Sequence, residues 1–227
     1  MSGSQNGKYR LCKKTIRKNM NADIYIYKLV ADNGGAPCAW RGLLSLAICK
    51  PKIRKSAQKK SLIFGFGAKC YDERLIYVAK VTAKPEVGEY YQNPAYAKRP
   101  DCIYHDVSGS AERKRFARFH NTTDERKKDV GLNFENAFVL LSKNFRYFGK
   151  SGTADYKEHF PAIKNLIEGL KRGHRVNHSA ELRKELISLA KQLWRKHPRK
   201  VLGAPTDSNR TGVCNKESPG CTVKASH

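Results

Sequence analysis

The pattern of hydrophobic and polar residues first predicts strands. Apolar residues dominate 23–30, 43–49, 61–67, 75–82 and 137–141, each bounded by Gly, Pro or polar residues. Residues 23–30 alternate Ile24-Tyr25-Ile26-Tyr27, and β-branched and aromatic residues favour strands. Apolar runs of this length between Gly and Pro are typical of buried strands. The pattern therefore predicts a sheet built from these segments.

After residue 160 the apolar spacing becomes helical. Pro161 suits a first helical turn, and Ser179 can cap a second helix that ends before Pro198. The apolar stripes are Ile163, Leu166, Ile167 and Leu170 in the first helix and Leu182, Leu186, Leu189, Ala190 and Leu193 in the second. We expect both stripes to pack on the sheet.

The segment 43–69 joins two predicted strands through a basic connection. Pro51 ends the first strand, and the connection carries six cations and no acid, namely Lys50, Lys52, Arg54, Lys55, Lys59 and Lys60. Gly65 and Gly67 alternate with phenylalanines, which predicts a bulge or close approach of the backbone to a ligand. A solvated basic turn is the plain alternative.

Charge adds a candidate partner. The chain of 227 residues has a formal net charge of +25, which favours polyanions, above all nucleic acid. An anionic membrane surface is the competing candidate partner, but no run approaches the roughly 18 apolar residues of a spanning helix. The N-terminus has no apolar signal-peptide core, so we expect a cytoplasmic protein. We divide the chain into a basic flexible arm (1–21), one domain (22–205) and a disordered tail (206–227).

The seven cysteines are scattered and form no C-x-x-C pair. We expect reduced thiols and no metal site. Cys49, inside an apolar run, is interpreted as a small buried hydrophobe. No P-loop, dinucleotide fingerprint, nucleophile elbow or zinc-deaminase spacing occurs, so no cofactor is expected.

Aromatic, basic and histidine side chains supply the candidate site. Rings suited to stacking on a base are those of Trp40, Tyr104 and Tyr147. Cations suited to phosphate are Lys50, Lys52, Arg54, Lys69, Arg146 and Arg175. His105, His120 and His174 are the candidate acid–base groups. Surface and hydrogen-bonding roles are the alternatives for all three histidines.

Six short segments occur in an order that resembles a known family. They are Cys49-Lys50-Pro51-Lys52-Ile53-Arg54, Gly65-Phe66-Gly67, Leu75-Ile76-Tyr77, Phe145-Arg146-Tyr147-Phe148-Gly149, Gly173-His174-Arg175 and Gly203-Ala204-Pro205. Together they resemble the second nucleotide-modification-associated domain family of phages and bacteria. The family usually has Gly-Asp where this chain has Lys60-Ser61.

The resemblance implies a role beside DNA base modification, and the strand–basic turn–strand layout also looks like PUA-like barrels. We therefore expect an α+β fold, a small mixed and mostly antiparallel β-barrel with C-terminal helices packed on it. The implied partner is nucleic acid, DNA rather than RNA, together with a base-modifying enzyme, and not a membrane.

Three functions remain open at this point. The leading hypothesis is a non-catalytic reader that binds an unstacked or modified base in a basic, aromatic-lined cleft. The second is an enzyme that acts on a nucleotide or modified base through His105, His120 or His174. The third is an interaction module that recruits a modifying enzyme to DNA.

Overall fold

The computed structural model describes residues 22–171 and 173–207, so the predicted basic arm and most of the predicted tail lie outside the described residues. Thr206 and Asp207, assigned to that tail, are held by Asp32. The backbone N–H of Thr206 donates to Asp32 Oδ2 at 3.1 Å, and that of Asp207 donates to the Asp32 carbonyl at 2.8 Å. The ordered chain therefore extends at least to Asp207.

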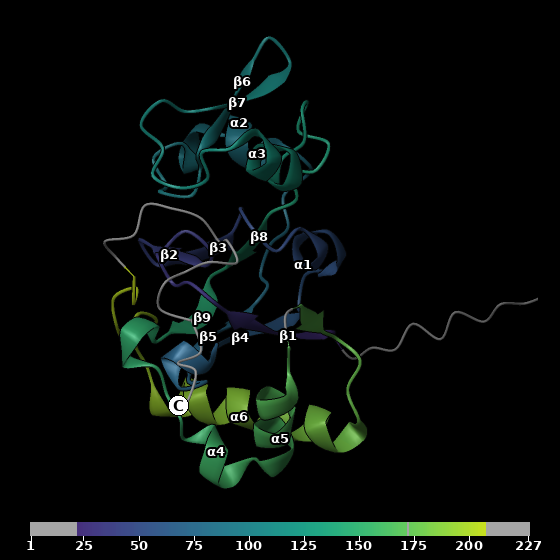
Figure 1. The fold of residues 1–227 in the computed structure, drawn as a ribbon, viewed down its shortest axis with the longest axis vertical. Helices are drawn as coiled ribbons and strands as arrows, with labels where there is room; N and C mark the ends of the chain where they lie inside the picture. Colours follow the sequence, from purple (N-terminus) through teal and green to yellow (C-terminus); the bar gives the residue numbers. More distant parts are fainter. Residues whose placement is uncertain (1–21, 172, 208–227) are drawn as a thin grey trace, which may run out of the picture.

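A mixed five-stranded sheet forms the centre of the fold (Figure 1). Its strand order is β10-β1-β4-β5-β9, with β1 Ile24–Leu29, β4 Leu62–Gly67, β5 Leu75–Lys80, β9 Asn144–Tyr147 and β10 His174–Arg175. The β1–β4 pair is parallel and the other three pairs are antiparallel. A parallel pair needs a long crossover, which residues 30–61 provide.

That crossover contains the first helix and two strands of the second sheet, and the third strand of that sheet comes later in the chain. β2 Cys38–Trp40, β3 Leu43–Leu46 and β8 Leu140–Ser142 pair antiparallel in the order β2-β3-β8. The basic connection predicted as a turn is instead largely helical, as α1 Pro51–Ser56. Pro51 fits the first turn of α1, because that position needs no N–H donor. The predicted strand at 43–49 accordingly ends at Leu46.

Residues 81–139 form a layer beyond the second sheet (Figure 1). It contains α2 Glu89–Gln92, the hairpin of β6 Tyr104–Val107 with β7 Ser110–Arg113, and α3 Thr123–Asp129. A capping box between Thr122 and Glu125 starts α3.

Among the described residues, three short 3-10 turns lie within this layer and elsewhere: η1 Lys69–Tyr71, η2 Pro94–Tyr96 and η3 Gly149–Ser151.

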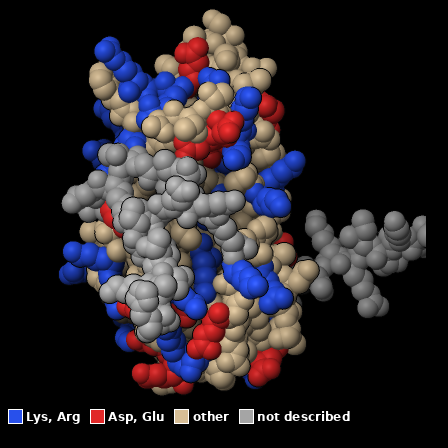
Figure 2. Space-filling view, viewed as in Figure 1, with Lys and Arg blue, Asp and Glu red and all other residues tan. Residues whose placement is uncertain are grey.

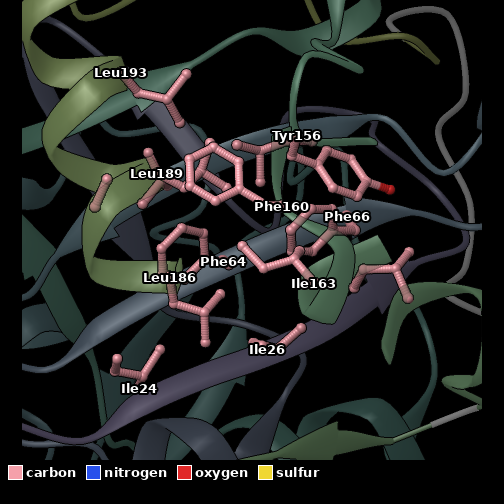
Figure 3. Packing of buried hydrophobic residues seen from close by; sticks show 14 of the residues in the cluster. Ile24, Ile26, Phe64, Phe66, Tyr156, Phe160, Ile163, Leu186, Leu189 and Leu193 are labelled. Atoms are coloured by element: carbon pink, nitrogen blue, oxygen red, sulfur yellow. The ribbon is translucent and has the colours of Figure 1, made fainter. Parts of the chain in front are cut away.

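Three helices cover one face of the central sheet: α4 Tyr156–His159, α5 Pro161–Gly169 and α6 Ala180–Lys196. The two predicted C-terminal helices are confirmed, and the Ser179 hydroxyl accepts from the backbone N–H of Leu182 at 3.2 Å. Figure 3 shows Leu186, Leu189 and Leu193 packed toward Phe64 and Phe66. α5 ends at Gly169 rather than near Gly173, and His174 pairs with β1 as part of β10.

Alternation along β1 buries both faces of the sheet. Ile24 and Ile26 belong to the core under α6, whereas Tyr25 and Tyr27 pack with Ile53 of α1 on the opposite face. Within the described residues, the sheets remain separate and none closes into a barrel. The α+β class is therefore confirmed, and the PUA-like barrel is not.

Two further features bear on the sequence expectations. No helix among residues 22–171 and 173–207 has both the length and the apolar character needed to cross a membrane. Cys70 is disulfide-bonded, so the expectation that the thiols are reduced is wrong for this residue.

Candidate active site

Cys49, His120 and Asp129 form a buried cluster between α1 and the layer beyond the second sheet. The Cys49 Sγ lies 3.1 Å from Nε2 of His120, and the other ring nitrogen of His120, Nδ1, contacts Oδ2 of Asp129. These residues come from the entry to α1, the loop before α3 and the last residue of α3. Their exposed fractions are 8%, 7% and 1%. The imidazole of His120 therefore lies between the thiol of Cys49 and the carboxylate of Asp129.

The backbone at this cluster is strained. Cys49, Lys50 and His120 have φ angles of 56°, 44° and 45°, in the left-handed region that residues other than glycine rarely adopt. Such conformations cost about 1–3 kcal/mol each and concentrate at active sites. The strain at Cys49 and Lys50 arises where β3 has ended and α1 begins, and the fold maintains it through several hydrogen bonds.

Asp129 is the centre of these hydrogen bonds. Its Oδ1 accepts from the Cys49 backbone N–H at 2.8 Å, and its Oδ2 accepts from the Tyr104 hydroxyl at 3.0 Å. Arg54 Nη2 lies 3.5 Å from Oδ1. A buried carboxylate needs such partners, because an unpaired buried charge is costly. Asp129 thus fixes both the backbone of Cys49 and the ring of His120.

Arg54 is part of this scaffold rather than a phosphate ligand. Its side chain is fully buried, and it donates to the backbone carbonyls of Cys49, Lys128, Asp129 and Phe138. A guanidinium has five N–H donors in a planar fork, which suits this role. The prediction that Arg54 holds phosphate therefore does not fit its position.

The remaining predicted cations differ in exposure and in their contacts. Lys50 lies over the Tyr27 ring, 4.8 Å from its centroid, and Lys52 and Lys69 are exposed on α1 and η1. Arg146 is buried and donates to the carbonyls of Phe145, Trp194 and His197, with its pKa lowered by burial. Lys50 and Lys52 are close enough to His174, the residue before Arg175, to lower its pKa, whereas Arg146 is bound to the end of α6. Arg175 is exposed on β10.

Only one of the three candidate histidines belongs to the cluster. His105 is exposed on the β6–β7 hairpin. His174 lies on β10, where burial and the nearby charges of Lys52 and Lys50 lower its pKa. His120 is thus the candidate that the tertiary structure places beside a thiol.

Two of the three predicted stacking rings line a cavity of about 270 Å³. Trp40 and Tyr147 contribute to its wall together with Phe119 and Arg118. Phe119 directly precedes His120, so the cavity and the cluster share a segment of chain. Tyr104, the third ring, is instead buried against Asp129. The cavity wall thus contains the partly exposed ring of Trp40, the buried rings of Phe119 and Tyr147, and one cation.

Gly65 and Gly67 make room for side chains of the protein. A Cβ at Gly65 would lie 2.2 Å from the Tyr77 ring, and one at Gly67 would lie 2.5 Å from Tyr71 Cβ. The pairing of β4 with β5 also shifts register between Gly65 and Phe66, so the predicted bulge is present. The space beside Gly65 and Gly67, which was predicted to admit a ligand, is filled by Tyr77 and Tyr71.

Sequence reasoning missed Cys49 as a reactive group and missed Asp129 entirely. The one local signal is the position of Cys49, directly before Lys50-Pro51, where an apolar run must change direction. Asp129 gives no such signal, because it looks like any acid near a helix end. Among the described residues, no cluster of His, Cys, Asp and Glu suited to a metal ion occurs.

Comparison with known proteins gives one match. The model of the family described as "Nucleotide modification associated domain 2" matches residues 20–212. No curated protein and no solved structure matches the chain.

Proposed function

The chain belongs to the nucleotide modification associated domain 2 family, and from this premise we propose that it is a cysteine-dependent enzyme acting on a nucleotide or nucleobase. Cys49 is the nucleophile, His120 the general base and acid, and Asp129 the group that orients His120. The observation that carries the proposal is the Cys49 Sγ–His120 Nε2 separation of 3.1 Å, with Asp129 on the far side of the ring.

The geometry suits nucleophilic catalysis. A thiol becomes a strong nucleophile when an adjacent base takes its proton, and a third group that orients the base completes the arrangement. His120 Nε2 is in hydrogen-bond reach of the Cys49 thiol, and Asp129 would stabilise the imidazolium that forms. The same imidazolium can later return the proton to a leaving group.

The neighbouring cavity supports a base-containing substrate. Trp40 is the partly exposed ring on which a base can stack, Phe119 and Tyr147 are buried in the wall, and Arg118 offers a cation for a phosphate. A volume of about 270 Å³ lies just below the range of about 300–1,000 Å³ for ligand pockets. A small group such as a single base or nucleotide therefore suits it better than a larger ligand.

The second candidate function is that of a reader, which binds a modified base without converting it. The ring-lined cavity would also serve such a binding protein. In that case Cys49 and His120 hold the fold, and the protein recognises a modified base for an associated enzyme. The two candidates differ in one respect: only an enzyme needs an activated thiol.

The reactivity of Cys49 tests the proposal without knowledge of the substrate. We expect iodoacetamide to alkylate Cys49 at pH 6 at least tenfold faster in the wild type than in His120→Asn, as measured by peptide mass spectrometry. An ordinary thiol has a pKa of about 8.5 and is almost entirely protonated at this pH. Cys102→Ser, a change at another buried cysteine, is the matched control and should leave the rate unchanged.

Equal alkylation rates in the wild type and His120→Asn would overturn the enzyme proposal. A binding panel of modified and unmodified nucleotides and oligonucleotides then distinguishes the two functions. Turnover that Cys49→Ser abolishes supports the enzyme. A preference for one modified base that survives both Cys49→Ser and His120→Asn, with no turnover, supports the reader.

A further inference from the structure

A large open groove lies on the other side of the central sheet from Cys49. It has a volume of about 780 Å³, and α6 forms one wall while the starts of β1, β4 and β9 and the end of β5 form the other. Its lining residues are Ala22, Ile24, Lys60, Leu62, Lys80, Asn144, Arg183, Ile187, Ala190, Lys191, Trp194 and Arg195. None of the cations predicted from the sequence to contact nucleic acid is among them.

The charges around the groove are all of one sign. Its five ionisable lining residues are Lys60, Lys80, Arg183, Lys191 and Arg195, with no acid among the lining residues. None of these five forms an ion pair with another residue in the described part of the chain. Figure 2 shows Lys and Arg side chains interspersed with Asp and Glu on the face that it presents, whereas the lining of the groove has cations alone.

The floor of the groove is apolar and includes an aromatic ring. Ile24, Leu62 and Ile187 contribute aliphatic surface, and Trp194 on α6 contributes an indole. The buried Arg146 guanidinium lies 6.0 Å from the Trp194 ring centroid and donates to the Trp194 carbonyl. Trp194 is therefore supported from beneath while part of it remains exposed.

We infer that this groove binds a single strand of nucleic acid, with phosphates at the cationic rim and bases against Trp194 and the aliphatic floor. Single strands alternate a charged backbone with flat apolar bases, and grooves that bind them combine cations with stacking platforms. The inference is independent of the proposed function of Cys49, because it involves a different face and different residues.

Other occupants fit the groove less well. A flat bilayer cannot enter a concavity, although it would be attracted by the same charges. The residues that precede Ala22 carry no acid, and residues 208–227 carry one, so neither end of the chain complements five cations. An acidic peptide has the right charge, but only nucleic acid carries a flat ring on every charged backbone unit, and such rings stack on Trp194.

The test compares two charge-matched variants of the full chain. The groove variant is Lys60→Gln, Lys80→Gln, Lys191→Gln and Arg195→Gln. The control variant changes four exposed lysines elsewhere: Lys98→Gln, Lys127→Gln, Lys150→Gln and Lys164→Gln. Both lose the same charge, so a difference between them reports position rather than net charge. The probe is a fluorescein-labelled 20-nucleotide oligothymidylate, followed by fluorescence anisotropy at several salt concentrations.

We expect the groove variant to raise Kd at least tenfold at 0.15 M salt and the control to raise it less than threefold. The slope of log affinity against log salt should become shallower by about 2 to 3 in the groove variant, since each lost phosphate contact removes about 0.7. Trp194→Leu should weaken binding about tenfold while keeping the salt slope, because it removes stacking and no charge.

Three results would overturn the inference. The first is an equal loss of affinity in the groove and control variants. The second is competition by polyglutamate that matches unlabelled oligothymidylate at equal charge, which would indicate a general anion groove. The third is groove-dependent binding to vesicles with 30% phosphatidylserine without groove-dependent binding to the oligonucleotide.

Discussion

The side chain of Arg54 holds the backbone of Cys49: its Nε donates to the Cys49 carbonyl oxygen at 2.6 Å. The same guanidinium bonds to the carbonyls of Asp129 and Phe138 at 3.0 and 2.6 Å. A single side chain thus ties the entry of α1 to the end of α3 and to the segment before β8. Because φ at Cys49 is 56°, the bond also helps to keep a conformation that costs free energy.

Arg54→Met should lower the free energy of unfolding by about 3–5 kcal/mol, because it leaves the buried Asp129 carboxylate without its cation and several carbonyls without donors. Urea denaturation measures the change. Lys52→Met, at an exposed position two residues earlier, is the control and should stay within about 0.5 kcal/mol of the wild type. A loss below about 1 kcal/mol in Arg54→Met would contradict this scaffold role.

Asp129→Asn should slow alkylation of Cys49 at pH 6 more than tenfold, because an amide cannot stabilise an imidazolium as a carboxylate does. Tyr104→Phe removes one hydroxyl donor, 3.0 Å from Asp129 Oδ2, and leaves the charge. We expect its rate to stay within about threefold of the wild type. Peptide mass spectrometry gives the rates, and circular dichroism verifies the fold. Similar rates in Asp129→Asn and the wild type would show that Asp129 has only a structural role.

Gly65→Ala should destabilise the protein by about 1–3 kcal/mol or more, because the added Cβ would lie 2.2 Å from the Tyr77 ring and 2.6 Å from Leu29 Cδ1. Gly169→Ala is the matched control. A Cβ at this position would have no atom within 4 Å, so the change should not destabilise the protein. Thermal unfolding compares the two. Equal melting temperatures would mean that Gly65 is not required by packing against Tyr77.

His178 should make the protein less stable in mild acid. Its Nε2 lies 2.8 Å from the Ile24 carbonyl oxygen, which fits the neutral ring with a proton on Nε2. Its Nδ1 is buried and has no hydrogen-bond partner among the described residues. Burial is the main cause that lowers the His178 pKa, and Arg183 and Arg175 add to it.

The sign of this effect follows from the direction of the shift. Above the unfolded pKa of about 6.5 the His178 ring is neutral in both states, so it does not make the free energy of unfolding depend on pH. As the pH falls, the unfolded chain binds the proton first, so the free energy of unfolding decreases until the folded pKa is passed. His178→Gln should therefore lose less stability between pH 7 and 5 than the wild type, as measured by urea denaturation. His105→Gln, at an exposed site, is the control, and a His178→Gln profile that parallels the wild type would count against this assignment.

Local patterns sufficed for most of the scaffold. The alternation at Ile24-Tyr25-Ile26-Tyr27 and the spacing of Leu182, Leu186 and Leu193 predicted β1 and α6, because the side chains of such elements face a core at fixed intervals. The basic connection was misjudged, since Pro51 both ends a strand and begins a helix. The predicted barrel is not confirmed, because the local sequence of a strand does not determine whether its sheet closes.

The sequence by itself determined strands β1, β3, β4, β5 and β8, the two C-terminal helices, the excess of positive charge and the family. Only the tertiary structure placed His120 and Asp129 beside Cys49, 71 and 80 positions away along the chain. It likewise turned Arg54 inward and gathered Lys60, Lys80 and Arg195 around one groove. Periodicity records which face of an element is buried, whereas contacts between distant segments depend on how the elements pack, and no local pattern contains that information.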